Sequence, residues 1–239
     1  YCKSIKAIVV ITSDKCYDNI EKDYQYVETD SLGGFDPYSS SKACAEHVAS
    51  AYYHSFFMEK GVGLARARAG NVIGGGDWAL DRLIPDAVKN WSNNQKIIIR
   101  FPKAIRPWQH VLEPLSGYLI LAQKLMKDPE KFSFSCNFGP ASSNSKTVEE
   151  TIKQLANEWK ENANWKILDN NYPHEALNLQ LNNNKAKSLL DWEPRMNFEK
   201  TIFETVLWYK AYYNNSLSIK DLTLNQIKEY EKISSYELS

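Results

Sequence analysis

Short apolar runs alternate with longer amphipathic segments along most of the chain. The first run, AIVVITS at residues 7–13, is continuous and rich in β-branched residues, which is typical of a strand buried on both faces of a parallel sheet. Further strand patterns occur at residues 61–69, 96–101, 132–140 and 165–170. Helical patterns occur at residues 38–57, 81–91, 110–128, 147–159, 183–192 and 197–213. This alternation predicts an α/β fold with a parallel sheet.

Two helical segments carry more specific signals. In residues 38–57 the apolar or small residues Ala43, Val48, Ala51 and Tyr52 are expected to line one side. Thr147 with Glu150 three residues later is a capping-box pattern, so a helix is expected to begin there. The last 25 or so residues are polar, with a weak helical pattern near residues 225–232. The later elements are shorter and more polar, which predicts a second, smaller lobe.

Composition excludes several classes of protein. Hydrophobic residues make up 43% of the 239 residues, so the chain is expected to be globular. Lys+Arg and Asp+Glu are both 29, which removes any bulk electrostatic attraction for nucleic acid or an anionic membrane. No apolar run approaches the roughly 20 residues of a membrane span. The cysteines form no C-x-x-C or zinc-like pattern, so we expect no metal site, and we expect reduced thiols in or near the core of a cytoplasmic protein; they are Cys2, Cys16, Cys44 and Cys136.

Two short motifs carry candidate chemistry. In PYSSSK, Tyr38 and Lys42 lie one helical turn apart, and a phenol can act as a base near neutral pH if a nearby cation stabilises its ionised form. In TSDK, Ser13, Asp14 and Lys15 follow the first strand, and ligands of open α/β sheets bind at the carboxyl ends of strands. The alternatives are an exposed helix surface for the first motif and a strand-end turn, with Ser13 or Asp14 in a capping role, for the second.

Together the motifs resemble a known family. The stretches ITSDKCYDN, GGFDPYSSSKACAEHVASAYY, ARAGNVIGGGDWALDRLIPD and IRPWQHVLEPLSGYLILAQKL resemble the extended short-chain dehydrogenase/reductase family and, within it, the nucleotide-sugar 4,6-dehydratases. The resemblance covers about residues 6–213 and is greatest to the branch that acts on CDP-glucose. It implies a partial doubly wound, Rossmann-like parallel sheet with a smaller C-terminal α/β substrate-binding lobe.

The resemblance also implies a reaction and residue roles. In this family bound NAD oxidises C4 of the sugar, water leaves across C5 and C6, and the hydride returns to C6, giving a 4-dehydro-6-deoxysugar. Tyr38 would deprotonate the C4 hydroxyl, and Lys42 would assist it and hold the nicotinamide ribose. Ser13 would bind the C4 oxygen, Asp14 would be the acid for loss of the C6 hydroxyl, and Lys15, as an uncharged amine, would remove the C5 proton.

Substrate-binding positions follow in the same way. Asn71 and Arg106 match positions that hold the nucleotide-sugar diphosphate, and Arg100 and His174 are weaker matches; a guanidinium suits a phosphate because it binds bidentately. The alternatives are an Asn that turns the glycine-rich loop, solvated arginines and a surface histidine. We interpret GGG at residues 74–76 as a flexible loop beside the substrate.

One part of the family pattern is missing. No strand–G-x-G-x-x-G–helix unit occurs in the sequence, so we expect a C-terminal portion of a longer enzyme that neither binds NAD tightly nor turns over by itself. Residues 1–70 would complete the NAD-binding domain, 71–213 would form the substrate lobe interleaved with remaining Rossmann elements, and 214–239 a polar tail. The longer enzyme is expected to be a homodimer, with residues 38–57 and 111–127 as candidate dimer helices.

Other functions stay open at this point. Another nucleotide-sugar dehydratase, acting on dTDP-glucose or GDP-mannose, would use the same residues. A 4-epimerase needs the Tyr/Lys pair but no elimination pair, so Asp14 and Lys15 argue against it. A non-catalytic sugar-nucleotide-binding remnant is the alternative from a different class.

Overall fold

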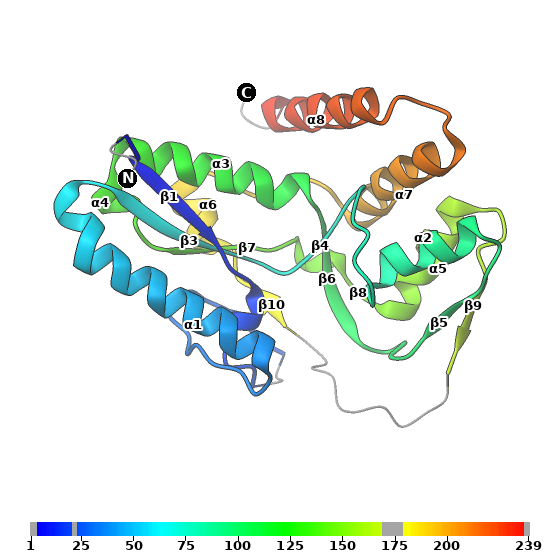
Figure 1. The fold of residues 1–239 in the computed structure, drawn as a ribbon, viewed down its shortest axis with the longest axis horizontal. Helices are drawn as coiled ribbons and strands as arrows, with labels where there is room; N and C mark the ends of the chain where they lie inside the picture. Colours follow the sequence, from blue (N-terminus) through cyan, green and yellow to red (C-terminus); the bar gives the residue numbers. More distant parts are fainter. Residues whose placement is uncertain (1–3, 21–22, 169–178, 237–239) are drawn as a thin grey trace. The chain divides into compact units, whose positions relative to one another are not determined.

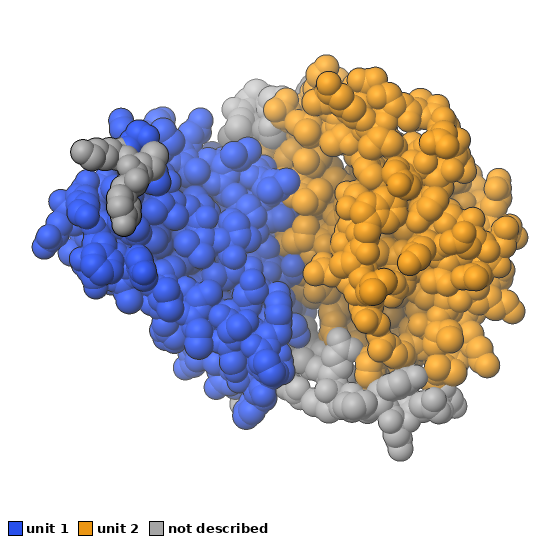
Figure 2. All heavy atoms as spheres, in the orientation of Figure 1, with its two compact units in different colours: residues 1–70, 113–140, 178–194 blue, residues 71–112, 141–177, 195–239 orange. Residues whose placement is uncertain are grey.

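The chain forms two compact units in the computed structural model, which describes residues 4–20, 23–168 and 179–236. Unit 1 comprises residues 1–70, 113–140 and 178–194, and unit 2 comprises residues 71–112, 141–177 and 195–239 (Figure 2). Each unit is thus assembled from three separate stretches of the chain.

Unit 1 contains a parallel sheet with the strand order β1-β3-β7 (Figure 1). Strand β1 spans Ala7–Ile11, β3 spans Gly63–Ala69 and β7 spans Ser135–Phe138. The side chains of β3 and β7 are almost all buried, as the apolar runs indicate, whereas those of β1 are half-buried and Ile11 at its end is exposed. The predicted α/β fold with a parallel sheet is confirmed.

Helices α1 (Pro37–Tyr52) and α3 (Leu112–Lys127) cover opposite faces of this sheet. Side chains alternate along β3, so Ala65 and Ala67 pack with α3, whereas Leu64 packs with the α1 side. Helices α1 and α3, which contain the two segments expected to form a dimer contact, therefore do not lie side by side on one face of the sheet.

The other elements of unit 1 are short. A π-helical turn and a 3-10 turn continue α1, and a 3-10 turn, η1, follows β1. Strands β2 and β10 pair in parallel. Their bounds are Asp14–Cys16 for η1, Gln25–Tyr26 for β2, Tyr53–Phe57 for η2, Met58–Lys60 for η3, Pro129–Phe132 for α4, Gln180–Leu181 for β10 and Asn184–Leu190 for α6.

The apolar side expected for α1 is correct at Ala43 and wrong at Val48, Ala51 and Tyr52, which are exposed. Its buried residues include Ala43, Glu46 and Ala49, whereas Val48 is 57% exposed and Tyr52 is 51% exposed. The prediction considered only apolar and small residues, whereas the buried side of the helix includes the carboxylate of Glu46. Tertiary pairing of that carboxylate, described below, decided the orientation of the helix.

Unit 2 contains short strands and an apolar helical core. Strand β6 (Ile105–His110) pairs in parallel with β4 (Asn71–Ile73) and antiparallel with β8 (Ser145–Thr147). Strands β5 (Ile97–Ile99) and β9 (Trp165–Ile167) form a separate parallel pair. The core packs α2, α5 and α7 together through Trp91, Ile152, Leu155, Ile202 and Val206.

Three helices of unit 2 match their predicted positions closely: α2 (Leu83–Ser92), α5 (Val148–Trp159) and α7 (Phe198–Asn214). The unit also contains the 3-10 turn η4 (Ser142–Asn144), which the sequence pattern does not predict, and α8 (Ile219–Tyr236). The capping box of α5 is confirmed: the Glu150 amide donates to Thr147 Oγ1 at 3.1 Å, and the Thr147 amide donates to Glu150 Oε2 at 2.8 Å. The polar tail contains α8, a longer helix than the weak pattern predicts.

Two of the three described cysteines are buried. Cys16 and Cys136 lie in the interior of unit 1, but Cys44 is exposed on α1, so the expectation of core thiols fails for Cys44. Burial raises the pKa of Cys16 to about 12, so it stays a neutral thiol. None of the helices among the described residues has the length and apolarity to cross a membrane.

Candidate active site

The TSDK motif forms a tight turn directly after β1. Ser13 is the N-cap of η1, with its Oγ accepting from the Lys15 amide at 3.2 Å and donating to Asp14 Oδ1 at 2.9 Å. Ser13 and Asp14 are buried, and Lys15 is half-buried. The capping role that the sequence allowed for Ser13 is therefore present, and it holds three polar groups at the carboxyl end of the strand.

The PYSSSK motif forms the first turn of α1. The carboxylate of Asp36 is its N-cap and accepts from the amides of Tyr38 and Ser39, each at 3.0 Å, while Pro37 occupies the first turn. Lys42 Nζ lies 5.5 Å from the centroid of the Tyr38 ring. The Tyr38 side chain is 55% exposed, so a ligand can reach the phenol.

The turn and the helix lie against each other. Element η1 packs on α1 within unit 1, and the charge of Lys15 acts on Asp36. The pKa of Asp36 is lowered, first by hydrogen bonds from Ser39 and Tyr38 and then by the Lys15 ammonium. The fold thus brings the strand-end turn beside the helix that carries Tyr38 and Lys42.

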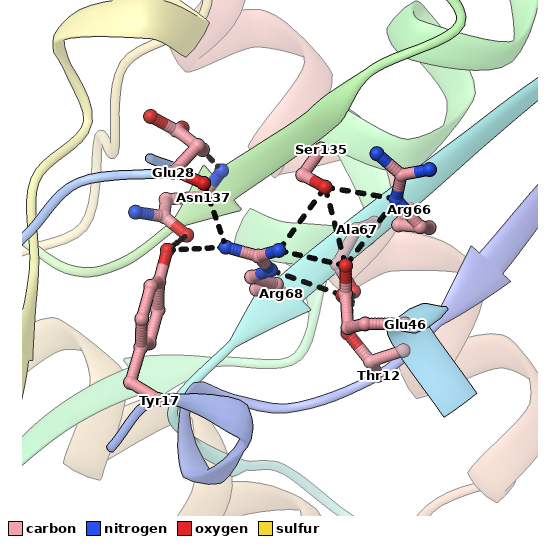
Figure 3. A network of polar contacts seen from close by, with 9 residues as sticks. All are labelled: Thr12, Tyr17, Glu28, Glu46, Arg66, Ala67, Arg68, Ser135 and Asn137. Atoms are coloured by element: carbon pink, nitrogen blue, oxygen red, sulfur yellow. Dashed lines mark hydrogen bonds and ion pairs between the residues drawn. The ribbon is translucent and has the colours of Figure 1, made fainter. Parts of the chain in front are cut away.

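A buried ionic network joins β3 to α1 and to the residues on either side of Ser13, Asp14 and Lys15 (Figure 3). Arg68 on β3 donates to the carboxylate of Glu46 on α1, and Glu46 also accepts from Thr12 Oγ1 at 2.5 Å. Burial by itself would raise the pKa of Glu46, but the hydrogen bonds and charge of Arg68 outweigh it and the pKa is lowered. Both side chains are therefore ionised in the interior.

Sequence reasoning missed this network. Two signals could have found it: Glu46 lies one turn after Lys42 on the inward side of the helix, and ARARA in a buried strand places Arg66 and Arg68 on one face. A charged residue in a core position is rare unless it is paired. An acidic and a basic residue in core positions of adjacent elements are therefore expected to pair with each other.

Two of the substrate candidates, Asn71 and Arg106, lie on strands of unit 2, and Arg100 lies just after β5. Asn71 begins β4 and is paired with Trp108 of β6, so Arg106, two residues earlier on β6, shares its sheet face. Arg100 is exposed and its Nη2 lies 3.5 Å from Asp81 Oδ1. His174 lies outside the described residues. The glycine-rich pattern predicts a loop at Asn71. That prediction is wrong, because Asn71 is a strand residue.

The GGG segment is packed rather than free. A Cβ added at Gly75 would lie 2.0 Å from the Trp208 ring, and Gly76 has φ +84°. Tyr209 OH donates to the Asp77 carbonyl at 2.7 Å and accepts from the Asp77 amide at 3.1 Å. The segment is a loop, as interpreted, and α7 anchors it through its aromatic side chains.

His110 at the end of β6 is a buried neutral histidine. Its side chain is 2% exposed, and burial lowers its pKa to about 4, with smaller opposing and reinforcing effects from Glu204 and Lys200 respectively. Sequence reasoning did not single it out.

Comparison with known proteins gives the family. The family described as GDP-mannose 4,6 dehydratase matches residues 2–205. The chain is 53% identical over 214 residues to CDP-glucose 4,6-dehydratase of Salmonella typhimurium, covering 87% of this chain and 60% of that protein. It is 23% identical over 217 residues to dTDP-D-glucose 4,6-dehydratase of Mus musculus, covering 90% of this chain and 59% of that protein.

A solved structure agrees with this assignment. The dTDP-glucose 4,6-dehydratase of Bacillus anthracis in complex with NAD superposes with a TM-score of 0.73 at 25% identity, covering 86% of this chain and 62% of that chain. The present chain thus spans about 60% of the length of the relatives it matches. On the family match across residues 2–205, the chain belongs to the GDP-mannose 4,6 dehydratase family.

Proposed function

We propose that this protein acts as an NAD-dependent CDP-glucose 4,6-dehydratase. The observation that carries the proposal is the 53% identity to the Salmonella typhimurium protein of that name. The product would be CDP-4-dehydro-6-deoxy-D-glucose. Since the chain covers only 60% of that relative, the activity is proposed for the full-length protein.

The residues present fit one end of the cofactor. Tyr38 is 55% exposed, and Lys42 carries its ammonium 5.5 Å from the centre of the phenol ring. A cation and a phenol at that spacing suit the hydroxyls of a nicotinamide ribose. NAD, when bound, would supply the hydride acceptor for C4 and the hydride donor for C6.

The first step would use Tyr38, Lys42 and Ser13. Tyr38 would take the proton of the C4 hydroxyl, and the Lys42 ammonium would stabilise the ionised phenol. Ser13 donates its single O–H to Asp14, and rotation of that O–H would let it donate to the C4 oxygen instead. The C4 ketone that results makes the proton on C5 acidic.

The elimination step would use the neighbouring pair. Lys15, as an uncharged amine, would remove the C5 proton, and Asp14, as a protonated acid, would give a proton to the departing C6 hydroxyl, so that water leaves. When the hydride arrives at C6, C5 needs a proton, which Lys15 would return. The supporting feature is that both side chains belong to one turn, η1, packed on α1.

The substrate diphosphate would be bound by unit 2. Arg106 and Asn71 share one face of the β4–β6 pair, and Arg100 is exposed at the end of β5. These groups supply a guanidinium and an amide suited to phosphate oxygens. A homodimer is proposed for the full-length protein, with Val48, Tyr52 and Phe56 as an exposed apolar surface in its support.

The test is an assay of the full-length protein. It would be incubated with NAD and, in parallel, with CDP-glucose, dTDP-glucose, UDP-glucose and GDP-mannose, and the 4-keto-6-deoxy product would be read by its absorbance in alkali. The expected result is product from CDP-glucose. Product from another nucleotide sugar alone would overturn the assignment of the nucleotide, and an interconverted 4-epimer without dehydration would overturn the reaction.

A further inference from the structure

The buried network ties both sides of the TSDK turn to Glu46 on α1, directly at Thr12 and through the Arg68 guanidinium at Tyr17 (Figure 3). Glu46 Oε1 accepts from Thr12 Oγ1 at 2.5 Å and from Arg68 Nε at 3.0 Å, and Oε2 accepts from Arg68 Nη2 at 2.7 Å and Ser135 Oγ at 3.1 Å. The carboxylate thus accepts two hydrogen bonds on each of its oxygens, which fills its acceptor sites.

The opposite side of Arg68 reaches the end of the turn. Its Nη1 donates to Tyr17 OH at 2.7 Å, and its Cζ lies 4.8 Å from the centroid of the Tyr17 ring. Tyr17 OH in turn donates to Asn137 Oδ1 at 2.8 Å. Burial raises the pKa of Tyr17, so the phenol stays neutral and can be donor and acceptor at once.

The residues of the network lie close in the sequence to the candidate catalytic residues. Thr12 immediately precedes Ser13, and Tyr17 is the C-cap of η1, so the two hydroxyls bracket Ser13, Asp14 and Lys15. Glu46 lies one helical turn after Lys42 on α1. The Glu46–Arg68 pair thus links the turn to the helix.

Stability alone gives weak grounds for such a pair. The cost of removing two charges from water offsets most of their attraction in the interior. The forked geometry, however, fixes direction as well as distance, and a displacement of about 1 Å in an active site can cost about 100-fold in rate.

We infer that Glu46, Arg68, Thr12 and Tyr17 are positioning residues, which set the place of the elimination pair Asp14–Lys15 relative to Tyr38 and Lys42. This inference rests on the proposed function. It assigns the network chiefly to the second chemical step: loosening the turn displaces Asp14 and Lys15, which are both groups of that step, whereas of the first step's groups only Ser13 moves and Tyr38 and Lys42 keep their own helix.

The test removes the hydroxyl of either Thr12 or Tyr17 and leaves the Glu46–Arg68 ion pair intact. Thr12→Val removes the donor to Glu46, Thr12→Ser keeps it, and Tyr17→Phe removes the acceptor for Arg68. Thr205→Val is the matched control, because Thr205 is also fully buried and donates, at 2.8 Å, to a carbonyl in unit 2. Each full-length variant would be mixed with CDP-glucose and NAD in single-turnover experiments that follow NADH absorbance and product.

The expected result is a change in the ratio of the two steps. Thr12→Val and Tyr17→Phe should slow elimination by about 10- to 100-fold and should slow C4 oxidation less, because Tyr38 and Lys42 stay in place and only Ser13 shifts, so that NADH accumulates transiently. Thr12→Ser and Thr205→Val should show no such transient.

Two outcomes would overturn the inference and are distinguishable from each other. If the wild type dehydrates CDP-glucose and Thr12→Val and Tyr17→Phe lower both steps equally, or neither, the network is merely structural. If the wild type dehydrates none of the nucleotide sugars, the proposed function fails and the inference fails with it.

Discussion

Arg68 donates a forked pair of hydrogen bonds to Glu46, from Nε to Oε1 at 3.0 Å and from Nη2 to Oε2 at 2.7 Å. The two side chains are 2% and 1% exposed, respectively. Arg66 Nε lies 3.3 Å from the same carboxylate. Loss of the negative charge would thus leave two guanidinium groups close together in or near the interior.

Replacing Glu46 should therefore destabilise the protein strongly. Glu46→Gln keeps the shape but leaves Arg68 as an uncompensated buried charge, and we expect a loss of about 3–5 kcal/mol in the free energy of unfolding. Urea unfolding of the full-length protein would measure it. Lys153→Ala, which breaks the exposed pair with Glu149, should cost no more than about 1 kcal/mol; equal losses would contradict the role of burial.

Stability should fall with acid through His110. The folded-state pKa of about 4 lies below the ordinary 6.5, so between these values the unfolded chain binds more protons and stability increases with pH. Lowering the pH from 7 to 5 should remove about 2 kcal/mol through this residue. The measurement is urea unfolding at both pH values, with His110→Gln compared to the wild type; an unchanged pH dependence in the variant would refute it.

Lys15 should separate the two steps of the proposed reaction. Lys15→Met retains an unbranched apolar side chain but has no base for the C5 proton, so we expect product formation to fall by about 100-fold or more. Oxidation at C4 should continue, and stopped-flow absorbance at 340 nm should detect NADH. Lys124→Met, at a half-buried lysine on α3 to which no role in the reaction is assigned, is the control. Dehydration at the wild-type rate in Lys15→Met would show that another group is the base.

Gly75 should tolerate no side chain. A Cβ at this position would lie 2.0 Å from the Trp208 ring, so Gly75→Ala should lower the free energy of unfolding by about 1–3 kcal/mol through overpacking. Combining it with Trp208→Leu in a double-mutant cycle should recover part of that loss. Strict additivity of the two changes would mean that the contact is not responsible.

Local patterns were sufficient for the secondary structure and for the polar motifs. The apolar run at residues 7–13, the helical period after Pro37 and the Thr147–Glu150 box each depend on neighbours a few residues away, and the structure has all three. The spacing of Tyr38 and Lys42 is likewise a property of one helical turn. Their roles in catalysis stay predictions.

The failures have a common physical cause. The inward side of α1 depends on a guanidinium 22 residues away from Glu46 in the sequence, and the packing of GGG depends on aromatic side chains of α7. A propensity pattern treats Glu46 as a surface residue and gives the three glycines no packing partner, because it contains no information on distant partners.

The sequence by itself thus determined an α/β chain with a strand-end turn and a Tyr/Lys helix, since short-range hydrogen bonding and side-chain periodicity are encoded locally. Only the tertiary structure decided which face of that helix is buried and what holds it against the turn. Charge pairing in the interior decided it, because a buried carboxylate is tolerated only where a cation and hydroxyl donors from other strands meet it.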